Sequence, residues 1–323
     1  MIDVVNLALP FFGLIFAGAV AAKLFHIEER TGDRLNILVL YFALPAMIYL
    51  TVADAPFEQL LNWPFILATS VSTLLMFVAA FTFAVLVLGV RVHVAGLQAS
   101  AASYGNVGYM GLILSVVVFG EAAAVPAILI FCFDILIQFT LVPLAGAIGT
   151  SAHGATRTEL GRRIAGSVLL HPFFVATAAG AVAAAFELQL PTALDSFLEM
   201  MARAAAPAAL FALGITLSKR RFAGVGPEFP VIVGLKMFAH PVIVLAVLSL
   251  IGGFDPLWIS VAVLMAALPT AASVYIFAEQ YDAYLEGASS SILVTTLVSA
   301  VTVPALLYVI DRGLLPYNLF GGW

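Results

Sequence analysis

Long apolar runs separated by short polar stretches dominate this chain. Ten runs can be drawn, over residues 4–24, 34–53, 63–89, 94–119, 122–149, 164–186, 192–217, 228–250, 255–281 and 285–311. Each is close to or longer than the ~20 residues that a helix needs to span a bilayer. The runs lack the ~10-residue alternation of a membrane barrel. The pattern therefore predicts an all-α polytopic membrane protein with ten transmembrane helices.

The fourth run contains residues that a stable membrane helix avoids. Asn106 and three glycines fall within the nine residues from Ser103 to Gly111. Glycine costs about 1 kcal/mol in a helix interior, and an amide in hydrocarbon costs more unless it finds partners. We expect the helix to break near Gly105-Asn106 and to restart. Unpaired backbone at that depth persists only where it is buried in protein or lines a polar cavity.

The chain also repeats itself at a spacing of 162 residues. The Pro-Phe-Phe of 10–12 recurs at 172–174, and Pro45 recurs as Pro207. An Ala-Gly-Ala-Val-Ala-Ala stretch that begins at Ala17 recurs with the same spacing. These coincidences of several prolines predict an internal duplication.

Because five segments per half is an odd number, the two halves are expected to be inverted relative to each other. The duplication predicts a first five-helix repeat over 1–150, a cytoplasmic linker over 151–163 and a second repeat over 164–323. Moved by about the same spacing, the break at Gly105-Asn106 falls on Pro269-Thr270, where the proline interrupts the ninth helix. Inverted repeats with interrupted helices are typical of secondary transporters.

Positive residues are unevenly distributed between the loops. Ten of the thirteen Lys and Arg residues fall on one predicted side: Lys23, Arg30, Arg34, Arg91, Arg157, Arg162, Arg163, Lys219, Arg220 and Arg221. Such residues stay on the cytoplasmic side, so we expect a multi-pass inner-membrane protein with both termini outside. Only 10% of residues are charged, and the net charge of −5 is spread over loops. We therefore expect the protein to be surrounded by membrane lipid and not to bind nucleic acid.

The two breaks together predict an anion site. Each half-helix that begins at a break presents unpaired N–H groups and about half a positive charge. Restarts near Asn106 and Thr270 would direct these ends toward one place, where they can bind a carboxylate. The candidate substrate-binding residues are Gly105, Asn106, Val107, Gly108, Tyr109, Pro269, Thr270, Ala271, Ser273 and Arg203.

Several of these residues also have structural interpretations. Asn106 can cap its own half-helix, which is compatible with lining the site. Tyr109, like Ser103 and Tyr104, is typical of packing or of hydrogen bonds within the helices. Arg203 can bind the second carboxylate of a dicarboxylate in bidentate fashion, and it can equally tether two helices.

Coupling to an ion gradient needs an ionisable group inside the membrane. Asp134 lies in the middle of the fifth run, with Gln138 one turn later on the same face. Burial beside a broken helix would let Asp134 exchange a proton. The alternatives are a structural ion pair with Lys236 or Arg203, or an electrostatic role toward the substrate. Lys236 can also extend to the membrane interface.

Two stretches around the expected breaks carry family motifs. They are Gly-Asn-Val-Gly-Tyr-Met-Gly at 105–111 and Ala-Leu-Pro-Thr-Ala-Ala-Ser at 267–273, followed by Glu279-Gln280. They resemble the crossover motifs of the auxin efflux carrier family, within the bile acid, arsenite and riboflavin transporter superfamily. The resemblance covers essentially the whole chain. It implies a fold similar to sodium/proton antiporters, a carboxylate-binding role for Asn106 and a hinge role for Pro269.

The short central loop makes the chain similar to bacterial members of that family, which are mostly named malonate or malate permeases. Plant members export the auxin indole-acetate. We therefore expect a secondary active transporter of small organic anions, such as malonate, malate or indole-acetate, that works by alternating access. The substrate, the direction and the coupling ion, H⁺ or Na⁺, stay open. A homodimer through the first, second, sixth and seventh segments is a further hypothesis.

Other functions have weaker support in the sequence. It shows no nucleotide-binding loop, nucleophile elbow, metal-ligand cluster or redox motif, so no enzyme, cofactor or metal is expected. His171 and His240, each before a proline, are interpreted as capping or interfacial residues. A sodium/proton exchanger stays open, although such exchangers usually carry two core acids and the fifth run has Asp134 alone. A non-transporting sensor or structural subunit is the other alternative.

Overall fold

The computed structural model of the chain is helical throughout the part that it describes. It describes residues 2–27, 29–149, 161–162, 165–166, 169–219, 222 and 226–320, and it contains no strand there. Six helices in those ranges are long and apolar enough to cross a membrane, and four shorter helices are also apolar. The chain is therefore a multi-pass, all-helical membrane protein. Of the predicted linker 151–163, only residues 161 and 162 lie among the described residues.

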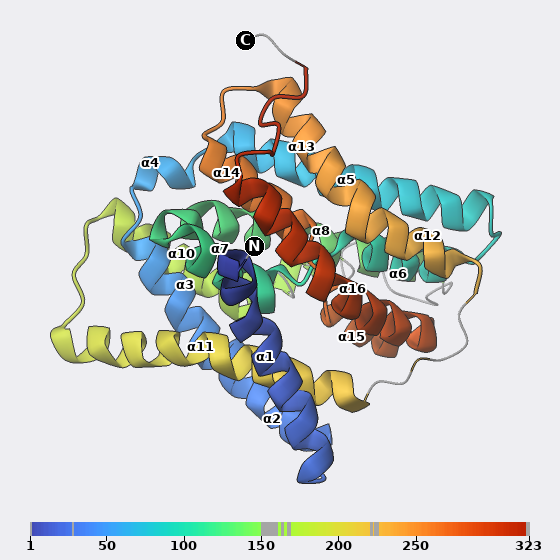
Figure 1. Cartoon of the computed structure of the whole chain (residues 1–323), viewed down its shortest axis with the longest axis horizontal. Coiled ribbons are helices and arrows are strands. Elements are labelled where there is room, and N and C mark those ends of the chain that lie inside the picture. Colours follow the sequence, from blue (N-terminus) through green and yellow to red (C-terminus); the bar gives the residue numbers. More distant parts are fainter. Residues whose placement is uncertain are drawn as a thin grey trace.

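Within its described residues, the first half of the chain forms eight α-helices, which can be followed in Figure 1, two π-helical turns and one 3-10 turn. In order they are α1 (Ile2–Leu24), α2 (Glu29–Leu38), η1 (Val39–Ala43), α3 (Leu44–Ala53), α4 (Phe57–Leu60), α5 (Trp63–Leu86), α6 (Val92–Ser103), η2 (Val107–Gly111), α7 (Leu112–Phe119), η3 (Glu121–Ala123) and α8 (Ala124–Gly149).

The second half follows in the same manner. Its elements are α10 (Pro172–Ala185), α11 (Thr192–Lys219), α12 (Glu228–Gly234), η4 (Leu235–Ala239), α13 (His240–Ile251), α14 (Pro256–Ala266), α15 (Ser273–Gln280) and α16 (Leu285–Asp311). The predicted fourth and ninth segments are each divided between two helices, whereas most of the others contain one long apolar helix.

Prolines explain two of the wide π-helical turns. The turns η1 and η4 come directly before Leu44-Pro45 and His240-Pro241, which begin α3 and α13. A proline offers no N–H to the carbonyl four residues earlier, and its ring clashes with that carbonyl. The helix responds by opening one wide turn, which is common at functional places.

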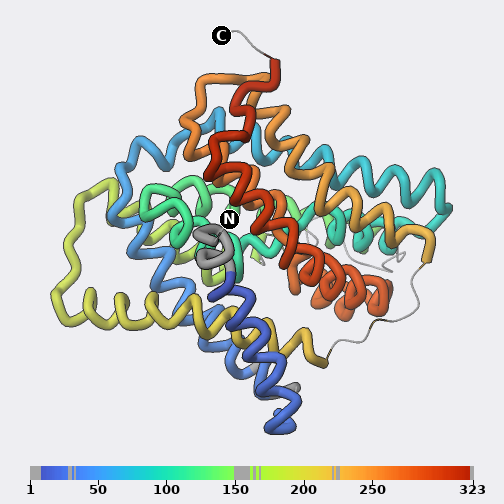
Figure 2. The backbone as a smooth tube through the Cα atoms, viewed as in Figure 1, coloured from blue at the N-terminus to red at the C-terminus, as the bar shows by residue number. Residues whose placement is uncertain are grey.

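The helices form two packed groups, which Figure 2 shows as continuous tubes. In the first, called here the α11 group, α1, α2 and α3 pack on α11, and α10 packs on α3. In the second, the crossover group, α5, α6, α8, α13 and α14 pack on one another, and α15 and α16 join them. Contacts of η2 with α11 and of α16 with α1 connect the two groups.

Small residues let the α11 group pack closely. A Cβ on Gly18 of α1 would overlap the carbonyl of Phe211, and one on Gly214 of α11 would overlap that of Ile15. Gly180 of α10 faces α3 in the same way. Because lipid tails are as apolar as leucine, membrane helices associate through such close contacts rather than through hydrophobic burial.

Candidate functional site

The two interrupted segments meet and are joined through their backbones. The chain is extended at Tyr104, between α6 and η2, and it is also non-helical between α14 and α15. At these two breaks Gly105 pairs with Thr270 as an isolated antiparallel bridge. The Asn106 N–H donates to the Pro269 carbonyl at 2.7 Å, and the Ala271 N–H donates to the Tyr104 carbonyl at 3.0 Å. Each break thus satisfies backbone groups of the other, as membrane depth requires.

This joint corrects the predicted roles of Pro269 and Thr270. The Thr270 hydroxyl donates to the Ala101 carbonyl at 2.8 Å, and its N–H donates to Thr295 Oγ1 at 3.0 Å. Both donors that were expected to bind substrate are therefore engaged within the protein. The Pro269 carbonyl accepts from Asn106. These two residues hold the joint together. In α15 the N–H groups of Val274 and Tyr275 already donate to the Ala271 and Ala272 carbonyls, so the donors that remain for an anion are the N–H groups of Val107, Gly108 and Ser273.

The glycines of the first motif are explained by close approach. A Cβ on Gly108 would lie 2.8 Å from the ring of Phe131, which in turn packs against Phe173. One on Gly111 would overlap Met265 of α14. A larger residue at Gly111 would hold the two interrupted segments apart, and a larger residue at Gly108 would hold η2 away from α8.

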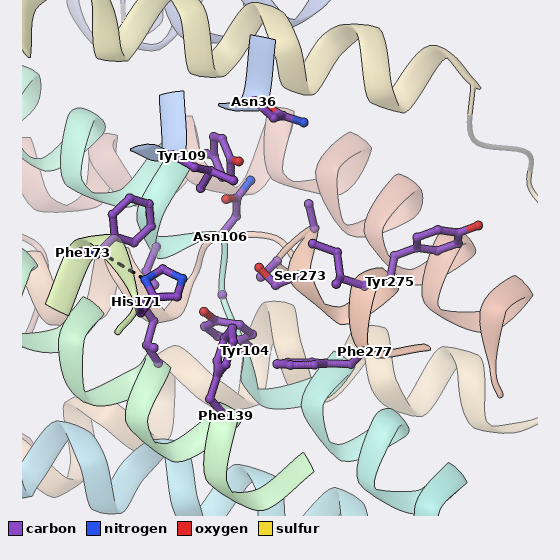
Figure 3. Close-up of a pocket in the computed structure, with 18 of the residues that line it drawn as sticks. Asn36, Tyr104, Asn106, Tyr109, Phe139, His171, Phe173, Ser273, Tyr275 and Phe277 are labelled. Carbon is purple, nitrogen blue, oxygen red and sulfur yellow. Dashed lines mark hydrogen bonds between the residues drawn. The ribbon is translucent and has the colours of Figure 1, made fainter. Parts of the chain in front are cut away.

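A cavity of about 660 Å³ lies beside the joint and is called here the crossover cavity. The starts of η2 and α15 both contribute to its wall (Figure 3). Seven of the ten predicted substrate-binding residues line it: Gly105, Asn106, Val107, Gly108, Tyr109, Ala271 and Ser273. Pro269 and Thr270 lie behind the wall in the joint described above.

Asn106 presents an amide to this cavity. Its side chain is only 3% exposed, and it makes no capping hydrogen bond although it is the N-cap residue of η2. In Figure 3 the amide lies between Tyr109 and Ser273. The capping interpretation is therefore not what the structure shows, and the amide has no hydrogen bond to another described residue.

Other residues of the wall come from distant parts of the chain. Asn36 of α2, Thr216 of α11 and several aromatic side chains line the cavity, among them Phe139, Phe173 and Phe277. His171 caps α10, because its Nδ1 accepts from the Phe173 N–H at 3.4 Å, and it also faces the cavity. Single polar residues such as Asn36 carry no sequence pattern that distinguishes them, so only the tertiary structure reveals them.

The structure corrects the placement of Arg203. Its side chain is 80% exposed and forms an ion pair with Glu199, one turn earlier on α11, at 2.9 Å. It does not line the crossover cavity. The i, i+4 partner on the same helix satisfies the guanidinium, so Arg203 neither reaches a substrate there nor tethers a second helix.

The predicted coupling residues lie in the core of the crossover group. Asp134 of α8 is 4% exposed and accepts a hydrogen bond from the Thr73 hydroxyl at 2.8 Å. Lys236 is fully buried, donates to the Ala266 carbonyl at 2.6 Å and contacts His240 Nδ1 at 3.2 Å. Asp134 and Lys236 are close enough to interact electrostatically.

This buried polar cluster overturns two interpretations. Lys236 does not extend to the membrane interface, and His240, at 2% exposed, is not interfacial. Gln138 lies nearby and donates from Nε2 to Ser103 Oγ at 2.9 Å, which fixes α8 to the end of α6. The cluster thus lies behind the joint, while the crossover cavity lies in front of it.

Fold and site together define a membrane protein in which two interrupted helices cross at a polar cavity. The sequence pattern of the family described as "Membrane transport protein" matches residues 3–154 and 160–307, so the chain belongs to that family. This confirms the resemblance drawn from the two motifs.

Relatives extend over nearly the whole chain. It is 41% identical to a protein of Rhizobium meliloti (strain 1021) named "Putative malonate transporter", over 99% of this chain and 100% of the relative. It is also 23% identical to "Uncharacterized transporter YfdV" of Escherichia coli (strain K12), over 93% of this chain and 96% of that protein. The comparisons therefore point to membrane transport rather than to an enzyme.

Proposed function

We propose that the protein is a secondary active transporter of small organic carboxylates, which bind in the crossover cavity. The observation that carries this proposal is the joint between the two breaks. It fixes two half-helices so that both begin on the wall of one cavity. Helix starts attract anions because their N–H groups are unpaired and carry partial positive charge. The buried amide of Asn106 adds a donor beside them.

Malonate is the first candidate substrate, since a relative of 41% identity is named for it. The cavity also has an aromatic wall, which suits a carboxylate attached to an apolar body. Indole-acetate is therefore the second candidate, and malate is compared as another small dicarboxylate.

The proposed mechanism is alternating access in a fold of ten crossings and two inverted repeats, with both termini outside the inner membrane. Reciprocal packing supports the duplication: Gly18 of the first half faces α11, and Gly180, 162 residues later, faces α3. The α11 group would be the scaffold, and two copies would dimerise through it within the lipid. The crossover group would move against this scaffold and carry the substrate.

Asp134 and Lys236 would couple transport to H⁺ or Na⁺. They are buried ionisable residues in a membrane protein, which are usually functional, and they lie behind the joint rather than in the cavity. A sodium/proton exchanger is the second candidate function, favoured by the buried contact between Asp134 and Thr73.

Uptake by the purified protein in proteoliposomes tests the proposal. Labelled malonate, malate and indole-acetate are compared with and without a pH or Na⁺ gradient, and protein-free liposomes are the control. Saturable uptake of at least one carboxylate is expected. Absence of saturable uptake for all three would remove the proposed function, and currents on a Na⁺ jump without any carboxylate would favour the exchanger.

A further inference from the structure

The charge balance of the crossover cavity sets a limit on its cargo. Among the described residues that line the cavity there is no lysine or arginine, and Glu279, which is exposed, is the one acidic residue. The polar wall is otherwise built from neutral donors: Asn36, Asn106, Ser273, Gln280, Thr216 and tyrosines. A carboxylate held here has no cationic side chain to pair with.

The positive potential that remains comes from the backbone. Two half-helices begin on the wall, and each helix start contributes about half an elementary charge, so together they balance about one negative charge. His171 adds little, because its Nδ1 accepts the Phe173 N–H and the neutral ring then offers only an Nε2–H donor.

The charges behind the joint do not change this balance. Lys236 lies close to Gly105, since its Nζ is 3.4 Å from where a Cβ on that glycine would be. Asp134, of opposite sign, shares the same buried cluster, with His240 beside Lys236. While Asp134 is ionised, its charge and that of Lys236 largely cancel at the distance of the cavity.

We infer that the crossover cavity selects cargo with a single negative charge, so that a dicarboxylate is bound with one of its carboxyl groups protonated. A second carboxylate would be buried without a counter-charge in a cavity whose one acidic lining residue, Glu279, has the same sign, which is strongly unfavourable. A protonated carboxyl group instead donates a hydrogen bond, which the neutral oxygens of the wall can accept. This inference rests on the proposed function and specifies the ionic form of the substrate.

Binding to the purified protein, measured without any gradient by competition against labelled malonate, tests the inference. Three compounds of similar size are compared between about pH 5 and about pH 8, a range that spans the second ionisation of a small dicarboxylic acid. Malonate changes from one to two charges, malonamate keeps one, and sulfoacetate keeps two. Malonate affinity should fall as pH rises, malonamate affinity should stay level, and sulfoacetate should bind at least about tenfold more weakly than malonamate.

Each other result has a separate meaning. Sulfoacetate that binds as well as malonamate, or malonate affinity that is independent of pH, would overturn the inference and leave the transport proposal intact. A parallel fall for malonate and malonamate would assign the titration to the protein and would also overturn it. Binding of none of the three would remove the proposed function as well, at least for such acids.

A variant designed to gain affinity for the doubly charged compound provides a second test of the inference. Asn36→Lys places a cation on the cavity wall, and Asn36→Gln is the matched neutral control. The lysine variant should bind sulfoacetate roughly tenfold more tightly than the glutamine variant does, because the second charge then has a partner. Equal sulfoacetate affinity of two folded variants would show that charge does not limit binding, and would overturn the inference.

Discussion

Two hollows of similar size differ in almost every other respect. The crossover cavity has a volume of about 660 Å³, and a second hollow of about 600 Å³ lies between η1, α3, α10 and α11. The second, called here the apolar groove, is lined by Tyr41, Phe42, Pro45, Ala46, Tyr49, Pro172, Val175, Ala176, Ala179, Leu190, Leu194, Phe197, Leu198 and Met201. The tyrosine hydroxyls are its only polar side-chain groups.

The difference lies in the backbone. Helices α10 and α11 also begin beside the apolar groove, but the Phe173 N–H donates to His171 Nδ1, and the N–H groups of Leu194 and Asp195 donate to the Pro191 carbonyl. At the crossover cavity, where η2 and α15 begin, no hydrogen bond within the described residues uses the N–H groups of Val107, Gly108 and Ser273. Volume therefore does not distinguish the two hollows; the partners of the first N–H groups of their helices do.

Filling the space at the crossing should give the largest effect. Gly108→Val would place two methyl groups against Phe131, which Phe173 holds in position. We expect carboxylate uptake to be abolished and stability to fall by about 1–3 kcal/mol through overpacking. Uptake assays and thermal unfolding in detergent measure the two effects.

Gly13→Ala in α1 is the matched control for that variant, because nothing lies within 4 Å of the added Cβ. It should keep full uptake. If Gly108→Val transported as well as the wild type, the close packing of η2 on Phe131 of α8 would not be needed for function.

Removing the Asn106 amide should come next in size. Asn106→Ala deletes a donor to a charged group, a bond of about 1.5–3 kcal/mol, so carboxylate affinity should fall by roughly tenfold or more. In the apolar groove, Tyr49→Phe removes a hydroxyl and should leave affinity unchanged. Equal effects of the two variants would remove the distinction between the hollows.

Neutralising the buried acid should affect coupling and leave binding largely intact. Asp134→Asn retains an acceptor for the Thr73 hydroxyl but can no longer exchange a proton. We expect gradient-driven accumulation to be lost while carboxylate affinity stays within about threefold, a change of less than 1 kcal/mol. Thr73→Ser, which keeps the hydroxyl, serves as the control.

A different outcome for Asp134→Asn is equally informative. Poor yield or a large loss of thermal stability would indicate that Asp134 chiefly stabilises buried Lys236, because removing one member of a buried charge pair is strongly destabilising.

Disrupting the exposed ion pair should have the smallest effect. Arg203→Ala breaks the contact with Glu199 on the surface of α11, and exposed pairs are worth about 0–1 kcal/mol. Uptake of malonate and malate should be unchanged. A selective loss of dicarboxylate uptake would contradict the structure and restore the substrate role first expected of this residue.

The places where the helices are interrupted could be predicted because they violate local rules. Asn106, the glycines around it and Pro269 are unfavourable in a membrane helix whatever surrounds them. What those residues contact was less predictable. Thr270 looked like a substrate ligand, yet its hydroxyl bonds to Ala101, a partner 169 residues away.

Orientation around a helix was the main limit of the sequence. In a membrane protein, lipid-facing and protein-facing sides are both apolar, so hydrophobic periodicity does not separate them. Arg203 was therefore directed inward although it faces outward, and for Lys236 both a buried partner and the membrane interface stayed open although the residue is buried. Asn36 and Thr216 escaped notice for the same reason, because each becomes part of the cavity only through packing of distant helices.

The joint between the breaks is made of main-chain atoms, from Asn106 to Pro269 and from Tyr104 to Ala271. Substitution of neighbouring side chains therefore does not by itself break these hydrogen bonds. Substrate preference can change during evolution while the fold is kept. The same backbone hydrogen bonds connect the two half-helices, so we expect them to move as one body. If the crossover group rocks against the α11 group, the surfaces that slide lie outside this joint, for instance at the contact between η2 and α11.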